Sequence, residues 1–256
     1  MKITLRLLAA ALAAAVLGVT PAFAVTGGTP DTAHPYVGVA GFLDSAGHHL
    51  SLCSGFLTSA TVFVTAGHCA GVSAPGAPQP AFAFIWFGSG PIVPGVTPPD
   101  DFGVAEASPA WNGVLPDHDI GVVHLLGPMP GPYATLAPLG YLDGLATKRG
   151  QQNVSFTSVG YGAVDASPAG VVAPFMRVAG SMQLEHLTDI DLFTTASAGN
   201  GTGGGATCVG DSGGPVFSGN YVVALISAGT KYCNGKAADF RLDTVEAQSF
   251  IAAAGS

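Results

Sequence analysis

The chain has 256 residues, and only 9% of them are charged, against about 25% in an ordinary globular protein. The 37 glycines and 19 prolines favour a loop-rich β protein over a helical bundle, with enough residues for one large domain or two small ones. Acidic residues outnumber basic ones 16 to 8, which argues against nucleic acid or an anionic membrane surface as a partner.

The first 24 residues predict a secretory signal peptide. Lys2 and Arg6 give a positive start, residues 7–19 form an apolar run, and Ala22-Phe23-Ala24 is an A-x-A cleavage site. A transmembrane anchor is the alternative, but the run is short and lacks a stop-transfer flank. We therefore expect a secreted mature chain, residues 25–256. Two of the 8 basic residues lie in the leader, so 6 remain against 16 acidic ones and the net charge is near −10.

Short apolar segments recur after the leader and predict β-strands. Each has a few β-branched or aromatic residues and is bounded by Gly, Pro, Ser or Asp, a pattern typical of a barrel or sandwich. Surface loops are expected at 71–81 and 88–101, and a proline-rich connector between two β halves at 127–150. The expected strands are residues 36–42, 50–57, 61–65, 82–87, 120–126, 154–161, 172–184, 215–217 and 221–227.

The C-terminal segment predicts one short helix. Asp243 is the expected N-cap, with Glu246 at the third helical position, and apolar residues from Val245 to Ala254 fall on roughly one face.

Four cysteines in an exported chain predict disulfides rather than free thiols. Three pairings are possible, and spacing alone does not choose among them. Zinc is a poor alternative because the chain has no C-x2-C pair.

The octet Cys208-Val209-Gly210-Asp211-Ser212-Gly213-Gly214-Pro215 sets one serine among three glycines. Glycine lets backbone N–H groups approach a bound group closely, and a serine nucleophile needs such donors for the developing oxyanion. A flexible Gly-rich turn is the plainer interpretation of such a run.

Two further segments supply a histidine and an acid. Thr65-Ala66-Gly67-His68-Cys69 ends a predicted strand in a small-residue turn, and Asp119 opens the apolar run that follows it. Asp117 is the alternative acid. His118 and His124 flank the acid, and a metal site there is the alternative to ordinary solvated histidines.

These three segments resemble the nucleophile, histidine and aspartate motifs of the chymotrypsin/trypsin-like serine proteases, in a secreted, bacterial-type form. Gly67 stands at the second small position of the family's T-A-A-H-C motif. The order His68, Asp119, Ser212 is that of chymotrypsin and differs from those of subtilisin and the α/β-hydrolases. The resemblance implies an all-β fold of two antiparallel six-stranded Greek-key barrels, at about 25–135 and 150–256, with a short C-terminal helix.

The resemblance also implies roles for individual residues. Ser212 is the nucleophile, His68 the general base and Asp119 the group that orients it, while the N–H groups of Gly210 and Ser212 form the oxyanion hole. The implied disulfides are Cys53–Cys69 and Cys208–Cys233.

The implied substrate-binding strand is Ser227-Ala228-Gly229, where Ala228 replaces the family's usual tryptophan. The pocket floor falls on Ala206, with Thr207 beside it, which argues against cleavage after Arg or Lys. Ile226 stands where glutamyl-specific relatives carry a histidine, so the expected pocket is open and mainly apolar. Asp239 falls inside the pocket in one alignment and on the strand leaving it in another.

The new N-terminus resembles the family's Ile/Val-Val-Gly-Gly. Val25-Thr26-Gly27-Gly28 departs from it only at Thr26, and Asp211 is the matching acid for an ion pair with the Val25 α-ammonium. Signal cleavage after Ala24 would itself create this terminus, so we expect no separate zymogen step.

Several short motifs are expected to carry no function. Residues 199–204 fit G-x-G-x-x-G but lead into the serine loop rather than a βαβ unit. Asn153 and Asn200 begin glycosylation sequons, and His48-His49 and Asp100-Asp101 are too small for metal sites. We expect a monomer that acts on protein or peptide substrates and is open to possible protein inhibitors. We expect it to need no cofactor. A catalytically silent binding protein on the same fold is the main alternative, and an esterase on another fold is the second.

Overall fold

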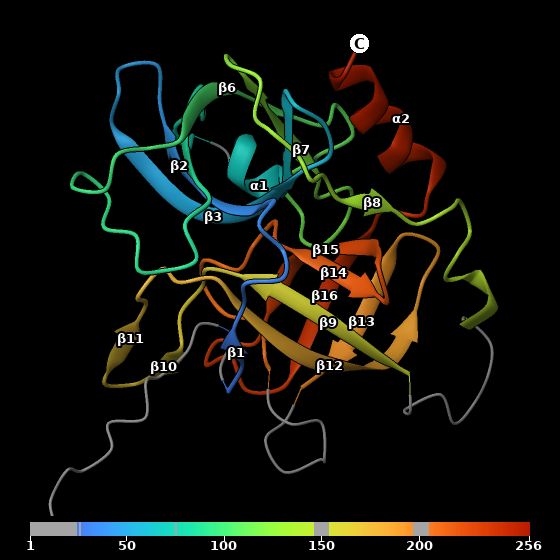
Figure 1. The fold of residues 1–256 in the computed structure, drawn as a ribbon. Helices are drawn as coiled ribbons and strands as arrows, with labels where there is room; N and C mark the ends of the chain where they lie inside the picture. The colour runs from blue at the N-terminus through green and yellow to red at the C-terminus, as the bar shows by residue number, and fades with distance from the viewer. Residues whose placement is uncertain (1–24, 26, 75, 146–153, 197–204) are drawn as a thin grey trace, which may run out of the picture.

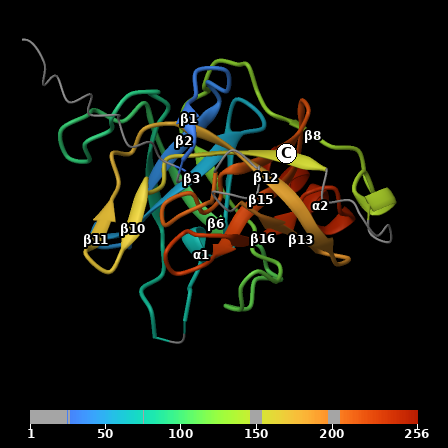
Figure 2. The ribbon, with the colours of Figure 1, turned by 90° about the horizontal axis from the view of Figure 1, so that it is seen from below.

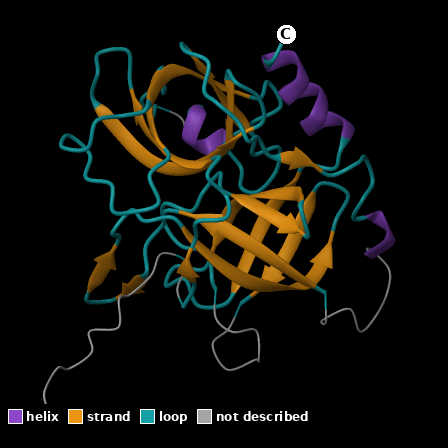
Figure 3. Ribbon diagram, in the orientation of Figure 1, coloured by secondary structure: helices purple, strands orange, loops and turns teal. Residues whose placement is uncertain are grey.

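The computed structural model describes residues 25, 27–74, 76–145, 154–196 and 205–256. In this part of the chain, strands build one barrel above another, and a single longer helix lies beside the upper barrel (Figures 1 and 3). None of the helices described has the length and apolar character that crossing a bilayer requires.

The first barrel closes through six antiparallel strands in the order β2-β3-β4-β7-β6-β5. Side chains alternate across each strand, so one set fills the interior, where Phe42, Phe63 and Ile85 are fully buried. The strands are β2 (Val37–Leu43), β3 (His49–Leu57), β4 (Val62–Thr65), β5 (Phe82–Trp86), β6 (Asp101–Ala107) and β7 (Gly121–Leu125).

The second barrel closes in the same manner, since β9 pairs with both β14 and β12 and completes the ring β9-β12-β13-β16-β15-β14. The two six-stranded barrels confirm the predicted fold class. The strands are β9 (Ser155–Gly160), β12 (Val178–Leu187), β13 (Asp191–Thr195), β14 (Pro215–Ser218), β15 (Tyr221–Gly229) and β16 (Lys236–Arg241).

Two short strands extend the second barrel, and a separate hairpin lies at its edge. β1 (Thr29–Pro30) pairs with β12, and β8 (Thr135–Leu136) pairs in parallel with β15. The hairpin of β10 (Asp165–Ser167) and β11 (Gly170–Val172) projects from the side of the molecule (Figures 1 and 2). The single strand expected at 172–184 is therefore wrong, because β11 ends at Val172 and β12 begins only at Val178.

The helices are short. α1 (Gly67–Ala70) follows β4, a 3₁₀ turn spans Asp143–Leu145, and α2 (Val245–Ala254) ends the chain. The predicted N-cap of α2 is wrong by one residue: Thr244 caps it, and its side chain accepts a hydrogen bond from the N–H of Ala247. Asp243 instead accepts hydrogen bonds from the Arg241 guanidinium and from the N–H of Leu142.

The barrels are joined by a buried arginine and by exchanged chain ends. Arg177, just before β12, donates to the carbonyls of Val37 (3.0 Å) and Phe87 (2.9 Å) in the first barrel and pairs with Asp31. The N-terminal β1 lies on the second barrel, whereas the C-terminal α2 packs against β4 and β7 of the first (Figure 1). These contacts fix the orientation of the two barrels and hence of the cleft between them.

Candidate active site

His68 lies in α1, the short helix that directly follows β4. The small residues before it allow this helix to approach the segment that carries Asp119. A Cβ on Gly67 would lie 3.0 Å from the N and O atoms of Ile120 and 3.2 Å from the Asp119 carboxylate, which is tighter than normal packing. Glycine at this position therefore brings His68 and Asp119 together.

Asp119 is fully buried and accepts two hydrogen bonds from His68. Oδ1 accepts from the backbone N–H at 2.7 Å, and Oδ2 lies 2.8 Å from the ring Nδ1. A carboxylate only accepts hydrogen bonds, so Nδ1 carries the proton and Nε2 is left as the acceptor on the exposed side of the ring. Ser227 also donates its hydroxyl to Oδ2, a contact the sequence did not indicate.

The alternative acid and the two histidines considered for a metal site make other contacts. In the described part of the chain, Asp117 forms no hydrogen bond to His68. The ring of His118 bonds to Glu246 in α2 at 2.7 Å, and that of His124 bonds to Glu106 at 2.6 Å. The one cluster of metal-ligating residue types in the described residues is Cys53, His68 and Cys69, and its two cysteines are joined to each other.

The serine loop is shaped by glycines in conformations that other residues avoid. Gly210 and Gly213 have φ angles of +97° and +80°. A Cβ on Gly213 would lie 2.3 Å from the Thr65 hydroxyl, so no other residue fits where this loop meets the first barrel. The N–H groups of Gly210 and Ser212 have no acceptor among the described residues, whereas the N–H groups of the neighbouring Asp211 and Gly213 are bonded to carbonyls.

Ser54 is a residue that the sequence interpretation missed. It is fully buried within β3, its hydroxyl donates to the Gly210 carbonyl at 2.8 Å, and it accepts from the N–H of Tyr161 at 2.9 Å. One side chain of the first barrel thus holds both the serine loop and the end of β9 in the second. Its position directly after Cys53 was the only available signal.

A cavity of about 270 Å³ joins these groups. His68 and Ser212 lie at one side of it, and Thr207, Ser227, Ala228 and Gly229 form part of its wall. The exposed Leu115 and Lys231 complete its edge.

The expected pocket-floor residue lies elsewhere, and Asp239 takes the second of the two positions considered for it, on a strand. Ala206 is packed in the core of the second barrel and does not line this cavity. Asp239 is fully buried on β16, opposite Ile226, and accepts a hydrogen bond from the Thr194 hydroxyl. Burial raises the pKa of Asp239 well above its usual value against the effect of that bond, and the nearby Asp191 raises it further.

Val25 and Asp211 lie against the same pair of strands. The Val25 side chain is fully buried beside Val178 and Gly180 of β12, and Asp211 packs on Gly160 of β9, which pairs with Val178. The Asp211 carboxylate accepts from the N–H groups of Gly162 and Cys208, both at 2.8 Å. These bonds lower the pKa of Asp211, but burial has the larger effect and raises it to about 7.

Both disulfides form as the resemblance implied. Cys53–Cys69 ties β3 to the helix that carries His68, and Cys208–Cys233 ties the serine loop to the segment after β15. Thr26, the sequons at Asn153 and Asn200, and the glycine motif at 199–204 lie wholly or partly outside the described residues.

The family model described as Trypsin matches residues 25–243. The chain belongs to the trypsin family. A solved structure of HL collagenase has the same fold, with 14% sequence identity, a TM-score of 0.63, and coverage of 86% of this chain and 94% of that one. A comparison with curated proteins gives no match. Trypsin-family membership supports a serine protease of the hydrolase class, a family whose substrates are proteins or peptides.

Proposed function

We propose that this trypsin-family chain is a secreted serine endopeptidase that cleaves peptide bonds through an acyl-enzyme. The observation that carries the proposal is the pairing of His68 with the buried Asp119 at a cavity that also contains Ser212. Two N–H groups without acceptors in the described chain, those of Gly210 and Ser212, belong to the same loop.

Each group has a role that follows from its surroundings. Ser212 attacks the scissile carbonyl while Nε2 of His68 takes its proton, and the same nitrogen then gives that proton to the leaving amine. Asp119 keeps the proton on Nδ1 and stabilises the imidazolium. The two free N–H groups stabilise the oxyanion. A water molecule then attacks the acyl-enzyme, with His68 again taking and returning the proton, and releases the acyl group from Ser212.

The proposed preference is for an apolar or medium-sized side chain before the cut. No carboxylate lines the described cavity, and Asp239 is buried in the barrel interior outside it. Lys231 at the edge of the cavity further disfavours a basic side chain.

Signal cleavage after Ala24 is proposed to activate the enzyme directly. It would free an α-ammonium at Val25, whose side chain is already buried beside the strand pair that holds Asp211. The new cation would pair with this carboxylate and hold the loop between Gly210 and Ser212 in place.

A fluorophosphonate probe tests the assignment, because it reacts only with an activated serine. We expect labelling of the secreted protein and none of the Ser212→Ala variant. Cleavage of denatured protein, read by mass spectrometry, then distinguishes a peptidase from an enzyme that acts on esters alone. A folded wild type that is never labelled would instead indicate a silent binding protein.

A further inference from the structure

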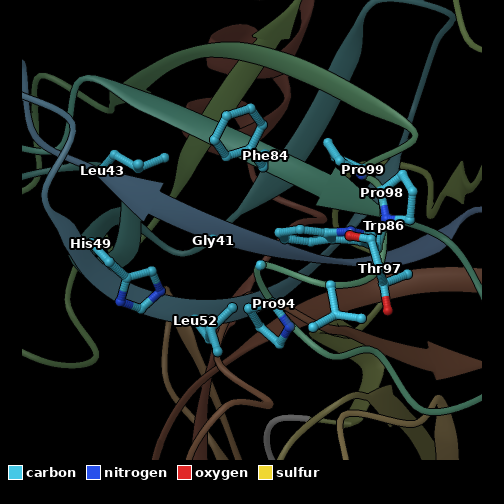
Figure 4. Close-up of a pocket in the computed structure, with 12 residues that line it drawn as sticks. Gly41, Leu43, His49, Leu52, Phe84, Trp86, Pro94, Thr97, Pro98 and Pro99 are labelled. Atoms are coloured by element: carbon cyan, nitrogen blue, oxygen red, sulfur yellow. The ribbon is translucent and has the colours of Figure 1, made fainter.

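A second cavity, of about 310 Å³, lies on the outside of the first barrel. Its lining is almost entirely apolar: Leu43, Leu52, Phe84 and Trp86 surround it, and prolines of the loop 94–99 close one side (Figure 4). None of its residues belongs to the His68–Ser212 cavity.

The hollow exists because a glycine forms its floor. Gly41 of β2 lies between Leu52 of β3 and Phe84 of β5 in the sheet register. A Cβ on Gly41 would already touch the Trp86 ring at 3.3 Å and Leu52 at 3.5 Å. Any larger side chain here would occupy the space that Figure 4 shows open above β2.

The walls are held in place without a ligand. The Trp86 indole N–H donates to the Thr97 carbonyl at 2.9 Å, and the Thr97 hydroxyl accepts from the N–H of Val93 at 3.0 Å. Four prolines between residues 91 and 99 restrict the same loop. A preformed apolar cavity binds an apolar group without first having to order its own walls.

β3 connects this cavity with the proposed oxyanion loop. Leu52 and Ser54 lie two residues apart and so face the same side of the strand, and Ser54 holds the Gly210 carbonyl at the proposed oxyanion loop. The His68–Ser212 cavity, with Ser227 and Gly229, takes the acyl half of a substrate on the side of the second barrel. The leaving half therefore continues past Gly210 toward Leu52.

We infer that this apolar cavity binds an apolar or aromatic side chain of the substrate polypeptide on the leaving-group side of the cut. The inference rests on the proposed endopeptidase function. Two residues of β3 span about 7 Å along the strand, and the neighbouring strand lies about 5 Å to the side, so the cavity floor lies roughly 9 Å from Ser54. This distance is about two to three residues of an extended chain. The step from the proposed oxyanion loop to Ser54, which holds the Gly210 carbonyl, adds about one more. The bound side chain therefore belongs to the third or fourth residue after the cut.

Matched peptide substrates test this. Two quenched fluorescent peptides differ only in Phe or Ser at the third and fourth residues after the cut, and a p-nitroanilide with no amino acid after the cut serves as reference. We expect kcat/KM about tenfold higher for the Phe peptide, as burial of one aromatic side chain permits. Phe84→Ser and Val96→Asp should bring the Phe-to-Ser ratio close to one. Val104→Ser, which changes an exposed apolar residue of β6 outside the cavity, should keep the tenfold ratio.

Binding without turnover separates this inference from the proposed function. In a Ser212→Ala, Trp111→Phe protein, Trp86 is the one remaining tryptophan, and its fluorescence should change as the Phe peptide, but not the Ser peptide, is added. Phe-dependent binding to this variant, together with no hydrolysis of either peptide by the wild type, would uphold the cavity and refute the endopeptidase. Hydrolysis with equal rates for both peptides, or a ratio that survives Phe84→Ser and Val96→Asp, would refute the cavity alone.

Discussion

The buried carboxylate of Asp211 makes the proposed activation step measurable as a pH effect on stability. The perturbation is one alanine retained before Val25, which moves the α-ammonium away from its site. Asp211 is then a fully buried acid with a pKa of about 7, against an ordinary value of 3.8. Between these two values the native state holds a proton that the unfolded chain has lost, so the free energy of unfolding falls as pH rises through this window.

The size of the effect follows from that difference. About three pKa units at 1.36 kcal/mol each amount to roughly 4 kcal/mol between pH 4 and pH 7.5. In the form that begins at Val25, the ammonium stabilises the carboxylate, lowers the pKa of Asp211 and removes most of this fall. The longer form should also lose most of its activity at neutral pH.

Urea unfolding at several pH values measures the difference between the two forms. Both carry Ser212→Ala to prevent self-digestion, and all other titrating groups cancel in the comparison. Asp211→Asn in the longer form should abolish its additional pH dependence. Parallel stability curves for the two forms, or an additional slope that persists in Asp211→Asn, would refute the proposed ion pair.

Three further substitutions test the site. Ser54→Ala removes the hydroxyl between the Gly210 carbonyl and the N–H of Tyr161, and should lower kcat about tenfold with little change in KM; an unchanged kcat would show that it has no positioning role. Asp119→Asn should fold normally but lose about 10⁴-fold in kcat, the loss known for the family's template enzyme, whereas Asp117→Asn should stay within a fewfold of wild type in the same assay. Ala206→Asp should not create a preference for Arg or Lys, because residue 206 lies in the barrel core. Peptide-library profiling measures this, and a gained preference for Arg or Lys would show that residue 206 lies at the pocket floor after all.

The strand pattern was readable where apolar residues dominate a segment. The barrel strands that escaped prediction, β6, β13 and β16, contain acidic or basic residues that would ordinarily mark a loop. In β16 both Asp239 and Arg241 are buried, and Arg241 pairs with Asp243 two residues further on and with Asp143 in a distant part of the chain. Because the contact with Asp143 is set only by the fold, a single sequence gives no sign of it.

The candidate site was more predictable than the fold around it. Small neighbouring residues pointed to His68 and Ser212, and the apolar run after Asp119 together with the chain order pointed to the acid. Ser54 and the hydroxyl contact of Ser227 were missed because a lone buried serine looks like any other strand residue. Ala206 was misplaced because counting back from Ser212 fixes a position in the chain but not the direction in which its side chain packs.

The exchange of chain ends between the barrels bears on how this molecule folds. β1 completes the later half of the chain, and α2 covers the earlier half, so neither half alone can bury its whole surface. The first barrel is covered by α2 only after Val245–Ala254 has been made. Synthesis of almost the entire polypeptide therefore precedes the completion of either barrel, and a chain truncated before Val245 would lack the helix that covers the first one.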